Sequence, residues 1–487
     1  MNLSRRAFLR RAGGAAFAPS LIGLAACNEL TAPPGEAGVA GSVLLGGHEG
    51  GSGDGGYGGL VESEDSPELR IPDGFRCVRI SRAGQPSLAD SGFVVPQALD
   101  GMAAFPLPNE NIRLIRNHEI RDVAGTATPF GPNAYDVRAG GGTTSLEVRV
   151  NRGGSGMIGE IEVIDEYPTL TGTLANCAGG PSPWSSWLSC EETCATRDEP
   201  HGYVFEVSAA ATAPVDPVPL KALGRFVHEA LAIDPDTGFV YLTEDRPFDG
   251  GRGVGSGFYR YLPEPGEGSA AWSDPSRGRL QALAIAGRPR YGTMTGQTPG
   301  TALPVEWVDI ADRDPSDAAV DSSAVFRQGL DRGAATFQRL EGCWYGDRSI
   351  FFNATSGGDA GMGQVWQYRP NGSADAQMGA SGGELVLVFE SPGADVLQSP
   401  DNITVSPRGG LVVCEDGAGI QLLRGVTRQG EIFDFVAQST PLPEFCGACF
   451  GPGAEILFFN IQGSTTSTGN ELGATYAMWG PWSRGAL

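Results

Sequence analysis

A short hydrophobic run that ends in a polar or acidic tripeptide recurs six times along this chain of 487 residues. A Gly-rich gap and a second hydrophobic run, such as the one from Tyr203 to Val207, follow most copies. Runs this short, separated by turn residues, indicate β-strands rather than helices. Six such units predict an all-β fold, a six-bladed β-propeller, and their uneven spacing predicts loop insertions. The tripeptides begin at Asn117, Cys190, Thr243, Asn353, Cys414 and Asn460.

Oxygen-bearing side chains gather at or near these strand ends, which a propeller would bring together at one rim. Carboxylates suit a hard cation such as calcium, and a neighbouring thiolate favours a transition metal such as iron. We expect Glu119, Glu191, Glu244 and Glu415 to converge at one face. The full set of candidate metal ligands is Glu119, Cys190, Glu191, Glu192, Glu229, Glu244, Asp245, Glu341, Glu415 and Asp416.

Three residues lie within two positions of a candidate carboxylate: Asn117, His118 and His228. We expect them to support the ligands by hydrogen bonding, although each could equally be an ordinary turn residue. With four histidines in the whole chain, a histidine-rich zinc site is not expected.

One cation stands close to a candidate ligand. Arg339 and Glu341 are two residues apart on an expected strand and therefore share a face. An arginine beside bound metals suits bidentate recognition of phosphate. A salt bridge between blades explains the same spacing, and the spacing does not choose between the two.

The composition is strongly acidic, with a formal net charge of −23. A phosphate backbone needs cationic neutralisation, so the charge argues against nucleic acid as a partner, and no binding through a basic patch is expected. The excess of carboxylates is consistent with a soluble exported protein and equally with sites that bind cations.

The N-terminus carries an export signal. Residues 4–9, Ser-Arg-Arg-Ala-Phe-Leu, form a twin-arginine motif, and the apolar run after it is too short to span a membrane. The run ends in a lipobox-like Leu-Ala-Ala-Cys, which predicts lipidation of Cys27, an ordinary signal peptide being the alternative. We expect an exported bacterial protein in the periplasm or cell envelope, touching the membrane only through this anchor. The expected parts are a signal peptide (1–27), a flexible Gly/Pro-rich tether (28–65) and one propeller domain (66–487).

Several stretches together resemble the PhoX-type bacterial alkaline phosphatases. The most specific runs from Asn176 to Glu192, and shorter ones contain Glu119, Glu229, Glu341 and Asn402. The resemblance implies a twin-arginine-exported β-propeller that hydrolyses phosphate monoesters with ferric iron and calcium.

Residue by residue, the resemblance implies that Cys190 binds iron, with Cys177 as the alternative thiolate. Glu229 and Glu341 would bind metal, and Arg339 would hold the phosphate. A metal-bound oxygen would then attack the phosphoryl group. We expect a monomer acting on small phosphate esters.

Two other functions fit a propeller with acidic strand ends. One is a calcium-dependent lactonase or esterase, which needs neither a thiolate nor a phosphate clamp. The other is a non-catalytic surface lipoprotein in which calcium is structural.

Overall fold

The computed structural model describes residues 54–89, 92–122, 128–154, 156–248, 253–371 and 382–487. Residues 1–53, which contain the predicted export motif, Cys27 and most of the expected tether, lie outside these ranges. Strands dominate the described residues. No helix in these ranges is long and apolar enough to cross a membrane. The helices are η1 (Lys221–Leu223), η2 (Ser269–Ser273), α2 (Ala324–Asp331) and η3 (Trp482–Arg484).

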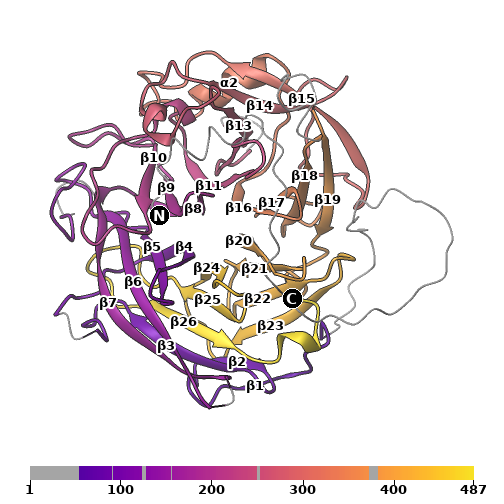
Figure 1. Cartoon of the computed structure of the whole chain (residues 1–487). Coiled ribbons are helices and arrows are strands. Elements are labelled where there is room, and N and C mark those ends of the chain that lie inside the picture. Colours follow the sequence, from indigo (N-terminus) through magenta and orange to yellow (C-terminus); the bar gives the residue numbers. More distant parts are fainter. Residues whose placement is uncertain (1–53, 90–91, 123–127, 155, 249–252, 372–381) are drawn as a thin grey trace, which may run out of the picture.

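The strands form six blades around a central axis (Figure 1). From the inside outward, blade 1 consists of β4 (Leu99–Pro106), β5 (Ile112–His118), β6 (Gly141–Arg152) and β7 (Ile158–Thr173). Blade 2 consists of β8 (Asn176–Pro181), β9 (Ser186–Glu191) and β10 (Val204–Ser208). Blade 3 consists of β11 (His228–Ile233), β12 (Val240–Glu244), β13 (Phe258–Leu262), β14 (Arg279–Ile285) and β15 (Ala302–Ile310).

The second half of the chain continues the ring. Blade 4 consists of β16 (Leu340–Gly346), β17 (Ser349–Ala354), β18 (Gln364–Arg369) and β19 (Glu384–Glu390), and β19 also pairs with β15 of blade 3. Blade 5 consists of β20 (Pro400–Val405), β21 (Leu411–Glu415), β22 (Leu422–Val426) and β23 (Ile432–Gln438), followed by β2 (Leu69–Pro72) and β1 (Leu60–Glu62). Blade 6 consists of β24 (Phe445–Phe450), β25 (Ile456–Ile461), β26 (Ala474–Trp479) and β3 (Arg76–Arg82).

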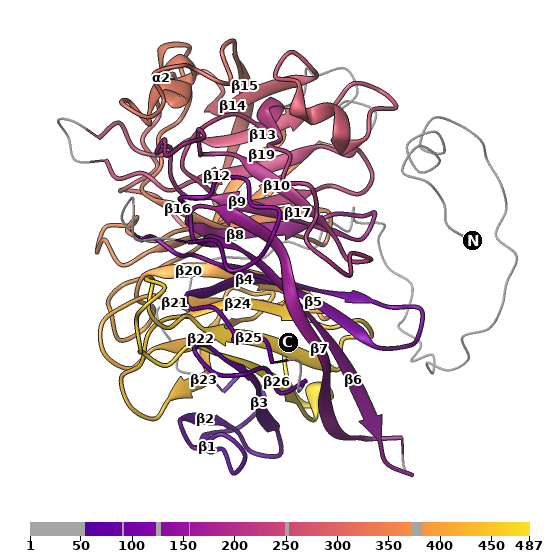
Figure 2. The ribbon, with the colours of Figure 1, turned by 90° about the vertical axis from the view of Figure 1, so that its left-hand side faces the viewer.

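The predicted six-bladed propeller is confirmed. Inner strands β4, β8, β11, β16, β20 and β24 contact one another in a closed ring. Figure 2 shows the ring from the side, with the long β6–β7 hairpin extending beyond it.

Hydrophobic side chains fill the space between adjacent blades. Alternate residues of a strand point to opposite faces of its blade, so neighbouring residues serve different interfaces. On β17, for example, Phe352 stacks on Phe258 of blade 3 with ring centroids 4.3 Å apart. Phe351 instead packs between blades 4 and 5. The core is therefore a series of apolar layers between blades, which fixes each blade relative to the axis.

The two ends of the chain close the ring. β3 pairs with the C-terminal β26, so strands from both ends share blade 6. Residues 54–65, which we expected in the tether, belong to the folded body: β1 extends blade 5, and the buried Tyr57 hydroxyl donates to the Leu487 carbonyl at 2.9 Å.

A buried ion pair braces the same closure. Arg116 of β5 lies 2.8 Å from Glu166 of β7, and neither side chain is exposed. Arg116 also donates to Thr475 of β26, and Ser81 of β3 donates to Glu166. This network joins blade 1 to blade 6.

Candidate active site

The second residue of each inner strand occupies an equivalent place at one rim of the ring. A register shift, as in a β-bulge, contains this residue in five blades and directly follows it in blade 6. Bulges release residues from ladder pairing and redirect their side chains. Because the inner strands surround the axis, these side chains approach one another. They are Asp100, Cys177, Glu229, Glu341, Asp401 and Cys446.

Five of these six residues belong to groups of donor atoms close enough to share a metal ion. Atoms within each group lie within 4.8 Å of one another. Cys446 is the exception, since its Sγ donates to the Leu99 carbonyl at 3.0 Å. Adjacent groups share Cys177 or Glu229 and so form one continuous band. The groups are Asp100–Glu119–Cys177, Cys177–Glu192–Glu229 and Glu229–Glu341–Asp401.

The band adjoins a cavity of about 260 Å³. Carboxylates dominate its wall, with two arginines and one thiol among them. Residues from five of the six blades, or from the loops beside them, contribute to it. The lining residues are Glu119, Arg121, Cys177, Glu192, Arg339, Glu341, Asp401, Asp416, Glu444, Gln462 and Thr465.

Small residues close the axis beneath the band. The residue after each rim donor is Gly, Ala or Asn, and the space they enclose with Trp344 is only about 10 Å³. A Cβ added to Gly101 would lie 2.5 Å from Ala178 Cα, and one added to Gly342 would lie 2.7 Å from Asn402 Cα. The small residues therefore let the inner strands approach closely enough for their donors to meet.

Burial leaves the carboxylates of the band poorly satisfied. Both Glu229 oxygens and one Asp100 oxygen are buried with no hydrogen-bond partner in the described part of the chain. Burial, followed by neighbouring carboxylates, raises the pKa of Asp100, Glu229 and Glu341 well above the usual range. Burial and Asp416 likewise raise the pKa of Asp401 to about 7. Bound cations would remove this cost, so the donor set fits metal ions.

Two arginines lie against this acidic wall. Arg339 donates to Asp245 at 2.8 Å and lies 3.2 Å from Glu341. Its backbone is left-handed, with φ of 51°, as at three other residues that directly precede inner strands: Ala98, Ala175 and Ser399. Arg121, three residues beyond β5, pairs with Glu119 and Glu192.

All six tripeptides begin on the second strand of a blade, and the three that begin with asparagine hold the neighbouring inner strand. Asn117 donates to the carbonyls of Cys177 and Ala178 at 3.1 and 2.7 Å. Asn353 donates to the Asp401 carbonyl, and Asn460 to the Asp100 carbonyl, both at 2.7 Å. Side chains of one blade thus fix the backbone that carries a donor of the next.

Cys190 occupies the equivalent position in blade 2 and does not line the cavity. It is fully buried in the apolar layer between blades 2 and 3, beside Leu188 and Leu231. The thiol at the cavity is that of Cys177, the alternative raised by the sequence. Burial raises the pKa of both thiols well above the usual range.

Three expected ligands do not converge at the rim, because they end second strands rather than begin inner ones. Glu244 accepts hydrogen bonds from the Tyr259 hydroxyl and the Gly257 amide. Glu415 pairs with Arg424 at 2.8 Å. Glu191 accepts from three backbone amides and contacts His201 at 2.6 Å.

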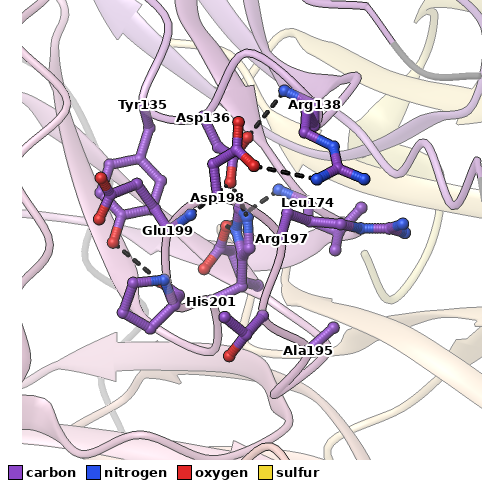
Figure 3. Close-up of polar contacts among 12 residues, drawn as sticks. Tyr135, Asp136, Arg138, Leu174, Ala195, Arg197, Asp198, Glu199 and His201 are labelled. Carbon is purple, nitrogen blue, oxygen red and sulfur yellow. Dashed lines mark hydrogen bonds and ion pairs between the residues drawn. The ribbon is translucent and has the colours of Figure 1, made fainter. Parts of the chain in front are cut away.

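His201 links Glu191 to a neighbouring loop. Its other ring nitrogen lies 3.5 Å from Asp136, and Figure 3 shows residues 195–201 beside Tyr135, Asp136 and Arg138. Burial lowers the pKa of His201, but the two carboxylates raise it by more, so the pKa lies above its usual value. This arrangement braces the loop that follows Glu192.

Some of the remaining expected residues lie at the cavity, and the others form hydrogen bonds away from it. Asp416 lines the cavity. Asp245 does not line it, but pairs with Arg339, which does. His118 contacts the Gln97 carbonyl and Thr144, and His228 contacts the Gly224 carbonyl, so both histidines are engaged away from the cavity. Burial lowers the pKa of His118 well below its usual range and that of His228 to about 3.

Sequence reasoning did not single out Asp100, Asp401, Glu444 or Arg121. A signal for the first two exists, because a donor followed by a small residue recurs six times, as in Asp100-Gly101 and Asp401-Asn402.

Comparisons with known proteins agree with this architecture. Residues 55–464 match the family model described as alkaline phosphatase PhoX. The structure of Pseudomonas fluorescens PhoX in complex with vanadate, a transition state analogue, aligns over 91% of this chain and 99% of its own, with a TM-score of 0.60 and 16% identity. XC5397, a gluconolactonase from Xanthomonas campestris, aligns over 87% of this chain and 98% of its own, with a TM-score of 0.42 and 11% identity.

A search of curated protein sequences finds no match. The family model nevertheless spans all six inner strands and the whole cavity wall except Thr465, within one continuous match. The chain therefore belongs to the alkaline phosphatase PhoX family.

Proposed function

We propose that this protein is a metal-dependent phosphatase that hydrolyses phosphate monoesters at the rim cavity. The observation that carries the proposal is the band of buried carboxylates around Cys177, with orphaned oxygens at Glu229 and Asp100 and Arg339 beside it. A phosphate ester needs positive charge around its phosphoryl oxygens, and this site combines a cation-binding donor set with a guanidinium group.

The donor types suggest which metals the band would hold. Cys177 supplies a soft sulfur to two of the three donor groups, which favours a transition metal there, and the resemblance to the PhoX-type phosphatases implies that this metal is ferric iron. Glu229, Glu341 and Asp401 offer only oxygen, which suits calcium. When bound, these ions would act as Lewis acids on the phosphoryl group.

Arg339 would bind and orient the substrate. Asp245 and Glu341 hold its guanidinium, and its side chain keeps 38% of its exposure, so it can reach a ligand in the cavity. Within the described residues, Nη1 of Arg339 donates no hydrogen bond to the protein. A donor held in place but not engaged suits the oxygens of a phosphoryl group.

The test is elemental analysis of the natively exported protein together with a chromogenic phosphate monoester assay. We expect iron and calcium to copurify, and chelation to abolish turnover. Hydrolysis of lactones without hydrolysis of phosphate esters would contradict the proposal and favour the lactonase alternative. A metal-replete protein with neither activity would favour the binding lipoprotein.

We also propose that residues 1–27 direct export by the twin-arginine route and that Cys27 is lipidated. Export of a folded chain would allow the buried band to be loaded before translocation. The observation behind this step is that Asp100, Cys177, Glu229, Glu341 and Asp401 are all buried in the folded protein.

A further inference from the structure

Arg121 bridges two blades at the rim of the cavity. Its backbone amide donates to the Thr465 carbonyl at 2.8 Å, which fixes the segment after β5 against the β25–β26 loop of blade 6. Its guanidinium pairs with Glu119 of blade 1 and Glu192 of blade 2. Its side chain nevertheless keeps 40% of its exposure.

Arg339 has the same arrangement between blades 3 and 4. It pairs with Asp245 and Glu341 and is exposed to a similar extent. These two arginines are the cations of the cavity wall, all of whose lining residues lie in the described part of the chain. Glu192 pairs with Arg121 and lines the same cavity as Arg339.

The donor inventory leaves both arginines able to bind a ligand. A guanidinium carries five N–H donors. Arg121 uses Nε and Nη2 on the carboxylates, and its Nη1 makes only a 3.5 Å contact with the Glu192 carbonyl. Both arginines therefore keep an Nη1 on the cavity wall that the described residues do not engage closely.

We propose that Arg121 is a second phosphoryl-binding arginine, which holds the substrate together with Arg339. The inference rests on the proposed phosphatase function and adds a residue that would favour monoesters over diesters. Two guanidinium groups match the two negative charges and three terminal oxygens of a phosphate monoester. A diester offers one charge and two free oxygens, so it would gain less from the second arginine.

The variants are Arg121→Ala, Arg121→Lys and Arg339→Ala in the full-length exported protein. Arg279→Ala is the control, since this exposed arginine pairs with Asp309 on the outer strands of blade 3. The measurements are kcat and KM for p-nitrophenyl phosphate and bis(p-nitrophenyl) phosphate, the inhibition constant of inorganic phosphate, and metal content.

We expect Arg121→Ala to weaken inhibition by phosphate roughly 10- to 100-fold, the range for losing a hydrogen bond to a charged group. Metal content should match wild type, and monoester turnover should fall more than diester turnover. Arg121→Lys should recover part of the phosphate affinity. A purely structural role would not change the ratio of monoester to diester activity.

Two results would overturn the inference: an Arg121→Ala variant with wild-type phosphate inhibition, or one that loses metal along with activity. The second would show that Arg121 only positions Glu119 and Glu192. A wild-type protein that hydrolyses neither ester would instead remove the proposed function. The binding role could then still be tested by measuring how much inorganic phosphate raises the thermal unfolding temperature of the wild type and of Arg121→Ala.

Discussion

Replacing Cys177 and Cys190 separately is the sharpest test of the proposed metal centre. Cys177 belongs to two of the three donor groups, so Cys177→Ala removes one ligand from each. Residues that merely support ligands are worth about 10- to 100-fold in metal affinity. Loss of a shared ligand should therefore weaken iron binding by more than about 100-fold, with a parallel loss of turnover.

Cys190→Ala should behave as a core substitution. Cys190 is fully buried in the apolar layer between blades 2 and 3, so its loss should cost about 1–2 kcal/mol of unfolding free energy. Metal content and activity should remain at wild-type levels. Cys177→Ser, which keeps a hard donor of similar size, should lose iron while retaining calcium.

The assays are elemental analysis after dialysis against a chelator, phosphate ester turnover, and urea unfolding. The reasoning is refuted if Cys177→Ala keeps its iron and its activity, or if Cys190→Ala loses them. Either result would mean that the position of the thiol at the rim does not determine where iron binds.

Three further predictions concern substrate binding, ring closure and export. Arg339→Ala should retain its metals and lose roughly 30- to 1,000-fold in turnover of a phosphate monoester, because it removes a charge-assisted contact worth about 2–4 kcal/mol; parallel metal analysis checks the first part. Glu166→Ala leaves the buried Arg116 without its carboxylate partner and should lower the free energy of unfolding in urea by about 3–5 kcal/mol. Changing both Arg5 and Arg6 to Lys should retain the protein in the cytoplasm, as cell fractionation would show, because twin-arginine recognition reads the pair rather than its charge.

The sequence by itself determined the class of fold and its repeat number. Hydrophobic runs of strand length, ending six times in a polar tripeptide, permit little other than a ring of small sheets. These patterns are local, since alternation and turn residues act within a few positions of one another. The specific stretch from Asn176 to Glu192 likewise pointed to the family, which the match over residues 55–464 shows.

Only the tertiary structure decided which polar residue of each repeat faces the axis. Every blade has a donor as the second residue of its inner strand and a polar residue at or next to the end of its second strand, and the two are alike in the sequence. Glu191, Glu244 and Glu415 end second strands and pair with residues away from the cavity. Glu229 and Glu341 lie at the start of inner strands and belong to the band.

Cys177 and Cys190 differ for the same reason. Cys177 lies on an inner strand within a bulge, which directs its thiol to the rim, while Cys190 lies one strand farther from the axis and faces the next blade. Distance from the axis depends on how six blades close into a ring through β3 and β26, and that closure joins residues from opposite ends of the chain. No local pattern carries this information, so the composition of the rim follows from closure of the ring.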